Sequence, residues 1–233
     1  MALSTFGYAF VGGLLPSLVW LYFLLKEDSR NPEPRSVITL AFLVGMVAVP
    51  LAIPLEQFAK SSLSGTLPVL TAWALIEEAL KYVAVAVFIL WRPAVDEAPD
   101  YVMYLITVAL GFAAVENMLF LLTPLSDGQV VSSFLTGDLR FVGSTLLHVV
   151  ASATLGFALA FSDASAPATR IGAGALGLIL AVALHTVFNA LIITGGASTT
   201  LAAVFFVWTA AFVLLAVFEV LKYFQYRNLP LIT

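Results

Sequence analysis

The stretch LPVLTAWALIEEALKYVAVAVFILW, residues 67–91, is an apolar run with only three charged side chains in it. A helix that crosses about 30 Å of hydrocarbon needs roughly 20 mainly apolar residues, and this run is long enough. An ionisable group inside a membrane is costly, so Glu77, Glu78 and Lys81 are candidates for function. The stretch therefore predicts a membrane-spanning helix that carries a polar site.

The rest of the chain has the same character as this stretch. Of its 233 residues, 61% are hydrophobic and 10% are charged, and the mean hydropathy is +1.04. A water-soluble domain of this size could not bury so much apolar surface. We therefore predict an all-α fold, a polytopic membrane helix bundle of about seven transmembrane helices in which residues 1–233 form a single integral membrane domain surrounded by the lipid bilayer.

Hydrophobic periodicity and breaker residues divide the chain into its expected helices. We expect helices near residues 5–26, 36–56, 67–91, 101–123, 139–162, 171–194 and 198–224. Pro50 and Pro54 are expected to kink or end the second of these helices. The first apolar stretch lacks a basic segment before it and is longer than the core of a signal peptide, so we interpret it as a helix of the mature protein.

The basic residues of the connections predict an orientation, because short cytoplasmic loops are enriched in Lys and Arg. With the N-terminus outside, the cytoplasmic side holds Lys26, Arg30, Arg35, Arg92, Arg170, Lys222 and Arg227. The outer side then holds only Lys60 and Arg140. This bias favours an N-out, C-in bundle.

Net charge and cysteine content exclude several kinds of partner and chemistry. The net charge is -4 and the basic residues are scattered, so we expect no nucleic acid partner. The chain contains no cysteine, which excludes disulfides, cysteine-ligated zinc and a thiol nucleophile.

The ionisable residues inside the predicted helices agree in depth. At 1.5 Å per residue, Glu77, Glu116, His148 and His185 all lie roughly 10–15 Å from the same side of the bundle. Packing residues would have no reason to agree in this way, so we predict one site built by four helices. The candidate site residues are Glu77, Glu78, Lys81, Glu116, His148, His185 and Asn189, with Asn117 a weaker candidate beside Glu116.

The charges of this candidate site do not balance. Lys81 can neutralise one carboxylate, and a low-dielectric environment disfavours the remaining negative charge of three glutamates. Protonation of one or two glutamates, protonation of the histidines, or a bound divalent cation such as Zn²⁺ would restore the balance. The residue types leave these alternatives open.

Both the metal-bound and the metal-free alternative support amide hydrolysis. Glu116, His148 and His185 have the ligand types of a catalytic zinc, with a second glutamate as general base. Without metal, a buried glutamate can activate water while His and Asn side chains stabilise the oxyanion. The HExxH motif of soluble zinc proteases is absent from the sequence.

Three other classes fit the polar residues less well. A proton- or cation-coupled transporter could use a buried Glu and His relay, but the two halves of the sequence show no convincing repeat. Haem ligation by His148 and His185 would place haem beside three carboxylates. A serine triad lacks its acid, because we expect every aspartate to lie in a loop.

In order and spacing, four motifs resemble the PrsW family of intramembrane proteases. They are Glu77-Glu78-Ala-Leu-Lys81, Gly111-Phe-Ala-Ala-Val-Glu116-Asn117, His148, and His185-Thr-Val-Phe-Asn189. Asp28 through Pro34 (DSRNPEP) also resembles the acidic, proline-bracketed loop that follows the first helix in this family, so the resemblance covers about residues 26–190. The family is related to the CAAX prenyl endopeptidases and to the bacterial CPBP superfamily.

This resemblance implies that a glutamate of the EExxK motif activates water, and that the later Glu, His and Asn positions stabilise the transition state or hold a metal. It implies an integral protein of a bacterial or archaeal cell membrane. It also implies a membrane-anchored protein substrate of the anti-sigma-factor type, cleaved on the extracytoplasmic side.

Overall fold

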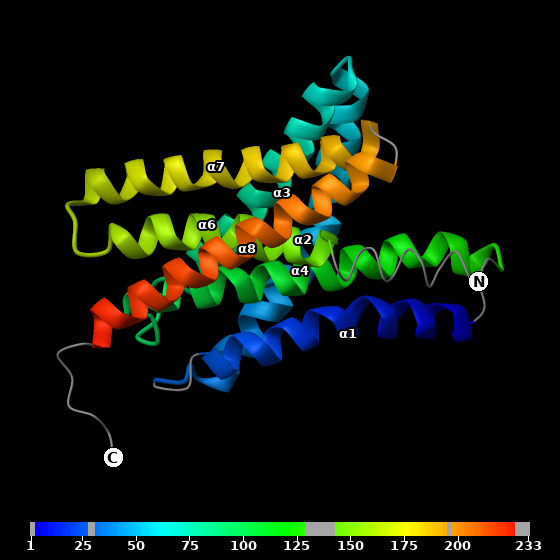
Figure 1. Cartoon of the computed structure of the whole chain (residues 1–233). Helices are drawn as coiled ribbons and strands as arrows, with labels where there is room; N and C mark the ends of the chain where they lie inside the picture. Colours follow the sequence, from blue (N-terminus) through cyan, green and yellow to red (C-terminus); the bar gives the residue numbers. More distant parts are fainter. Residues whose placement is uncertain (1–2, 28–30, 129–142, 195–196, 227–233) are drawn as a thin grey trace.

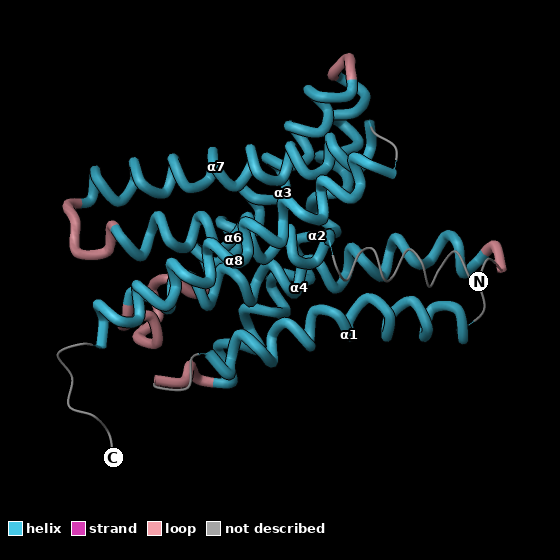
Figure 2. Tube along the Cα trace, viewed as in Figure 1, coloured by secondary structure: helices cyan, strands magenta, loops and turns pink. Residues whose placement is uncertain are grey.

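The computed structural model describes residues 3–27, 31–128, 143–194 and 197–226. Within these ranges the chain is helical and contains no strand, which confirms the predicted all-α class (Figures 1 and 2). The helices are α1 (Leu3–Glu27), α2 (Arg35–Ser62), α3 (Thr66–Phe88), α4 (Ala98–Ser126), α6 (Thr145–Phe161), α7 (Pro167–Thr194) and α8 (Ala197–Tyr226).

The helices agree with the predicted ranges, and most differ only at their ends. The largest difference is in α2, which continues past Pro50 and Pro54 to Ser62 instead of ending near residue 56. A backbone surrounded by lipid has no water to replace its hydrogen bonds, so continuing the helix is favoured even across proline. Parts of some predictions fall outside the described residues: positions 139–142 of the fifth predicted helix, positions 28–30 of the DSRNPEP loop, and Arg30, Arg140 and Arg227.

Five of the helices are long and apolar enough to cross a membrane. They are α1, α2, α4, α7 and α8. Two helices of the predicted set differ from them for physical reasons. Helix α3 carries Glu77, Glu78 and Lys81 in its middle, and the apolar helix α6 is short, at 17 residues.

Helix α4 is the centre of the bundle and packs against α1, α2 and α6. It crosses α2 at two glycines, Gly45 and Gly111, so that the two backbones meet directly. A Cβ atom on Gly45 would collide with the carbonyl oxygen of Val108, and one on Gly111 would collide with the carbonyl oxygen of Phe42. Small residues allow this close approach, which brings the α2–α3 hairpin against α4.

The start of α4 corrects one expectation. Asp100, predicted to lie in a loop, is in the first turn of α4 and is buried. Its Oδ2 accepts hydrogen bonds from the backbone N–H groups of Asp96 (2.9 Å) and Glu97 (2.7 Å), and the residue is part of a capping box.

Packing between the helices positions the candidate site. Helix α6 packs against both α4 and α7, and α3 packs against α2 and α7. Helix α3 also contacts α4 and α6, so the helices α3, α4, α6 and α7 form one connected group within the bundle. Figure 1 shows that α1 begins at the end of the bundle opposite to the end where α8 finishes.

Candidate active site

Side chains from four helices meet in one buried cluster between α3, α4, α6 and α7. The cluster contains Glu77, Glu78, Lys81, Glu116, His148 and His185. All of these except Glu116 are buried, while the Glu116 side chain is 21% exposed. Each helix contributes its residues from the face that it turns toward the others, which is why residues distant in sequence come together here.

His148 lies between a cation and a carboxylate. Its Nδ1 is 2.8 Å from the Lys81 Nζ, and its Nε2 is 2.8 Å from Glu116 Oε2. The ammonium of Lys81 can only donate, so the network assigns a lone pair to Nδ1 and an N–H to Nε2. Glu116 therefore fixes the orientation of the His148 ring from its outer side.

His185 is held in a similar way from the other side of the cluster. Its Nδ1 is 2.8 Å from Glu78 Oε1 and donates its hydrogen to that carboxylate, which leaves a lone pair on Nε2. Glu78 also accepts hydrogen bonds from Lys81 Nζ (2.8 Å) and from Ser152 Oγ (3.3 Å). Both carboxylate oxygens of Glu78 therefore accept hydrogen bonds from its neighbours.

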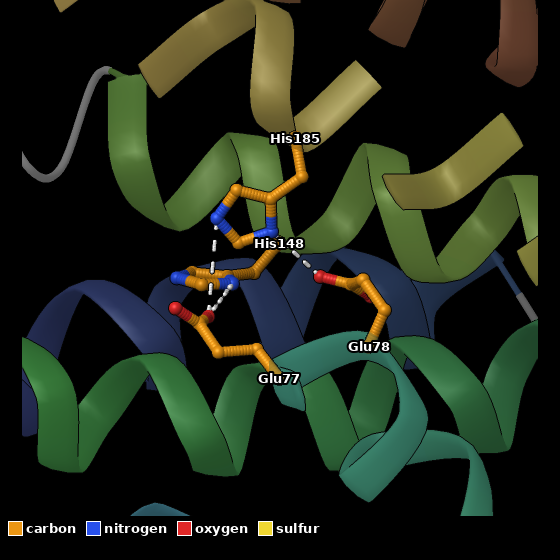
Figure 3. Close-up of side chains that lie close together, drawn as sticks. All are labelled: Glu77, Glu78, His148 and His185. Carbon is orange, nitrogen blue, oxygen red and sulfur yellow. Dashed lines mark hydrogen bonds and ion pairs between the residues drawn. The ribbon is translucent and has the colours of Figure 1, made fainter. Parts of the chain in front are cut away.

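Glu77 differs from Glu78 in having an oxygen left over. Among the described residues its Oε2 has no hydrogen-bond partner although it is buried. This oxygen lies 3.8 Å from His148 Nδ1, 3.9 Å from His185 Nε2 and 3.6 Å from Lys81 Nζ. Figure 3 shows the two imidazole rings and the two carboxylates turned toward one another. Glu77 Oε2, His148 Nδ1 and His185 Nε2 therefore face a common centre, where the lone pair of His148 Nδ1 is taken by Lys81 Nζ.

The donor set at this centre fits a divalent metal ion. Glu77, Glu78, His148 and His185 each offer one ligand atom, and these atoms all lie within 4.8 Å of one another. Neighbouring donors of a tetrahedral zinc site are about 3.3 Å apart. Glu77 Oε2, His148 Nδ1 and His185 Nε2 match the type of a catalytic zinc bound by two histidines and one carboxylate. Glu78 and Glu116 hold the outer nitrogens of the two rings, as carboxylates behind a metal commonly do.

This arrangement differs from the ligand set predicted from sequence. The prediction used Glu116, His148 and His185, whereas the group of close donor atoms contains Glu77 and Glu78 beside the histidines. Sequence spacing could not distinguish the glutamates, because all of them lie at the same depth and face the same histidines.

Two amide candidates lie outside this hydrogen-bonded set. Asn189 is half-buried on α7, one turn after His185. Asn117 is buried, and its Nδ2 donates to Thr145 Oγ1 (2.9 Å), which ties α4 to the start of α6.

Phe112 and Ser152 belong to the surroundings of the cluster and were not singled out as functional from the sequence. The Lys81 ammonium lies over the Phe112 ring, 4.4 Å from its centroid, a geometry that stabilises a buried cation. Phe112 lies four residues before Glu116 on the same helical face, and this spacing was the available signal.

An apolar cavity of about 350 Å³ lies elsewhere in the bundle, between α1, α4, α6 and α8. It is lined by Leu146, Val150 and Phe157 of α6, and Glu27 is the one ionisable residue among the described residues that line it. His148 and Ser152 contact the cluster on another face of α6. The cavity therefore does not contain the candidate site.

The fold and the cluster define a class: a helical membrane protein with a cluster of Glu and His side chains buried between its helices. The chain belongs to the PrsW family, described as intramembrane metalloproteases, and the family match spans residues 33–218. Family membership favours a membrane protease over a transporter. The expected relation to the CAAX prenyl endopeptidases and the CPBP superfamily stays a prediction.

Two curated relatives carry the description "Protease PrsW". The protein from Geobacillus kaustophilus (strain HTA426) is 32% identical over 114 residues, which are 47% of this chain and 50% of the relative. The protein from Bacillus subtilis (strain 168) is 24% identical over 176 residues, 74% of this chain and 77% of the relative. The alignment thus spans only half the length of the Geobacillus protein. No solved structure matches the chain significantly.

Proposed function

We propose that the protein is an intramembrane endopeptidase that hydrolyses a peptide bond of a membrane-anchored protein. Glu77 is the general base that binds the attacking water and accepts its proton. The observation that carries this proposal is the buried Glu77 Oε2, which lacks a hydrogen-bond partner among the described residues and faces two imidazole nitrogens. An unused acceptor in a closed polar cluster can take up a water molecule.

The neighbours of Glu77 provide the conditions for general base catalysis. Glu77 Oε2 accepts a proton from the water as the water oxygen attacks the carbonyl carbon of the substrate. The proton then passes to the leaving amine. Lys81 Nζ, 3.6 Å from this oxygen, compensates the negative charge. Glu78 keeps Lys81 and His185 in place through its two 2.8 Å contacts.

Other candidates take supporting roles in this mechanism. Glu116 orients His148 through the contact to its Nε2. Asn189, half-buried and one turn from His185, is assigned the role of donating its amide hydrogens to the oxyanion of the substrate. The surrounding helices keep bulk water away from the cluster. Each of these electrostatic contributions is therefore stronger than it would be in water.

A metal ion would be held by Glu77, His148 and His185, with Glu78 close enough to join them. Zn²⁺ held there would polarise the substrate carbonyl and lower the pKa of its bound water, and Glu77 would then be one of its ligands instead of the general base.

The wider assignment follows the family and the charge distribution. We propose that residues 1–233 form a single membrane protease domain with seven crossings, N-out and C-in, and that the site opens toward the outer side. A membrane-anchored substrate of the anti-sigma-factor type fits this position. Its cleavage would begin regulated proteolysis.

The test is cleavage in cells that co-express the protein with tagged copies of the single-pass anti-sigma factors encoded in its own genome. Wild-type protein should shorten at least one of them, and mass spectrometry should locate the cut near the outer side of its membrane span. Glu77→Gln should abolish this cleavage, because the amide cannot accept the proton of the water. Absence of cleavage by the wild type, or equal cleavage by Glu77→Gln, would contradict the proposal.

A matched control separates loss of chemistry from loss of charge. Glu219 is exposed on α8 and forms a 2.6 Å ion pair with Lys222, far from the cluster in the sequence and in its contacts. Glu219→Gln makes the same chemical change and should leave cleavage unchanged. Both variants should reach the membrane at the level of the wild type.

A further inference from the structure

The Lys81 ammonium lies among the atoms that would bind a metal ion. Its Nζ is 2.8 Å from His148 Nδ1, 2.8 Å from Glu78 Oε1 and 3.6 Å from Glu77 Oε2. All three atoms belong to residues of the close donor group. The Lys81 side chain itself is completely buried, and Phe112 covers the ammonium.

We propose that the Lys81 ammonium and a divalent metal ion compete for the same position, so that Lys81 sets the metal affinity of the site. This inference rests on the proposed function in its choice of ligands. It assigns to the lysine of the EExxK motif a role as the cation that the cluster holds in the absence of metal.

His148 provides the geometric reason for the competition. Its Nε2–H is used by Glu116, so Nδ1 is its only lone pair that faces the centre. A zinc ion on this lone pair would lie about 2.0–2.1 Å from Nδ1. The ammonium nitrogen lies 2.8 Å from the same atom. Along one lone pair the two cations would be about 0.7–0.8 Å apart, which excludes simultaneous binding.

Charge provides the second reason. Two cations at such short separation also repel each other strongly in a medium of low dielectric constant. The ammonium neutralises one of the three glutamates of the cluster, and a divalent ion would neutralise two. Metal binding is therefore favoured by the glutamates, but it requires the buried Lys81 side chain to leave its contacts with Glu78, His148 and Phe112. Removing the ammonium should remove this requirement.

The experiment measures zinc binding to the purified full-length protein in detergent, without substrate. Metal-free wild type, Lys81→Met and Lys81→Arg are titrated with Zn²⁺ against a chromophoric chelator, and bound zinc is counted by mass spectrometry. Lys81→Met keeps an apolar side chain of similar length and should bind zinc at least tenfold more tightly than the wild type. Lys81→Arg keeps a cation in the site and should not gain affinity.

Controls locate the effect at the cluster. Lys222→Met removes a lysine that pairs with Glu27 and Glu219, and it should leave zinc affinity unchanged. The double variant Lys81→Met/His148→Gln should lose the gained affinity, because it lacks His148 Nδ1, the nitrogen for which the ammonium and the zinc ion compete. If Lys81→Met does not remain monodisperse, Lys81→Gln provides the same comparison with a hydrogen-bond donor retained.

Equal or weaker zinc binding by the charge-free variants, or no zinc binding by any variant, would overturn the competition. Because no substrate is present, this result is independent of the cleavage test. A protein that cleaves its substrate through Glu77 and shows no gain on loss of Lys81 would retain the proposed function and refute only this inference.

Discussion

Two buried groups of acidic residues in this bundle differ in the kinds of side chain that they contact. The site cluster collects Glu77, Glu78 and Glu116 with two histidines and Lys81 from four helices. The second group, here called the loop cluster, contains Glu33, Glu97, Asp100, Tyr104 and Tyr226. It joins the segment before α2, the start of α4 and the end of α8.

In the loop cluster the hydrogen-bond donors serve to hold the carboxylates in place. The hydroxyl of Tyr104 donates to Glu33, the hydroxyl of Tyr226 donates to Glu97, and backbone N–H groups donate to Asp100. The site cluster instead uses groups that exchange protons and bind metals. Among the described residues each cluster leaves one buried carboxylate oxygen without a hydrogen-bond partner, Glu77 Oε2 in the site cluster and Asp100 Oδ1 in the loop cluster, but Glu77 Oε2 faces two imidazole nitrogens. A buried acid alone is therefore a poor indicator of catalysis, while a buried acid that faces two imidazole nitrogens is a better one. Changes in the site cluster should reduce activity, and changes in the loop cluster should reduce stability.

Among the residues around Glu77, the largest effect is expected for His185→Gln. Glutamine can still donate to Glu78, but it does not reproduce the imidazole nitrogen that faces Glu77 Oε2 at 3.9 Å. Cleavage of the co-expressed substrate should fall by about 10²–10⁴, the usual contribution of a positioned acid-base group. Size-exclusion chromatography should give the wild-type profile. Near-normal cleavage would assign His185 the purely structural role of the loop cluster residues.

A smaller loss is expected for Glu116→Ala. Without Glu116 the Nε2–H of His148 loses its 2.8 Å partner, and the ring is no longer held with Nδ1 toward the centre. Loss of such an orienting partner reduces activity about 10–100-fold. Glu116→Gln keeps an acceptor oxygen and should recover most of the cleavage rate. If both variants were equally impaired, the carboxylate charge of Glu116 would matter and not its orientation of His148.

In the loop cluster the expected effect is on stability. Tyr104→Phe removes the hydroxyl that donates to the buried Glu33 carboxylate. Loss of this donor should lower the free energy of unfolding by about 1–3 kcal/mol. Thermal unfolding in detergent, followed by tryptophan fluorescence, measures the change. The cleavage rate below the unfolding temperature should equal that of the wild type, and a reduced rate there would mean that the loop cluster acts on the site.

Much of the fold could be predicted from the sequence because lipid permits few backbone structures. Apolar runs of spanning length had to be helices, and their ranges followed from the breakers between them. What could not be predicted was the extension of α2 beyond residue 56 to Ser62, or the close crossing of α2 and α4 at Gly45 and Gly111. Pairwise packing between distant helices leaves no periodic signal in either sequence.

The membership of the site cluster followed from depth, but its internal order did not. Glu77 and Glu78 are adjacent in sequence, and only the structure distinguishes the occupied carboxylate of Glu78 from the free oxygen of Glu77. That difference depends on the rotation of α3 against α6 and α7, because about 100° of helix rotation separates neighbouring residues. The loop cluster was missed because its tyrosines lie in apolar stretches and have the appearance of packing residues.

The smallest effect is expected for Tyr226→Phe, and it compares two positions inside the loop cluster. Tyr226 donates to Glu97 Oε2 at 2.5 Å, but Glu97 is only partly buried, so water can replace the lost hydroxyl. The free energy of unfolding should fall by about 0.5–1.5 kcal/mol, the net value of an ordinary hydrogen bond. Measured beside Tyr104→Phe in the same thermal unfolding assay, it should give the smaller change. An equal or larger change would mean that the contact between α8 and the start of α4 contributes more to the stability of the bundle than the contact that holds Glu33, and that the degree of burial does not rank the two hydrogen bonds.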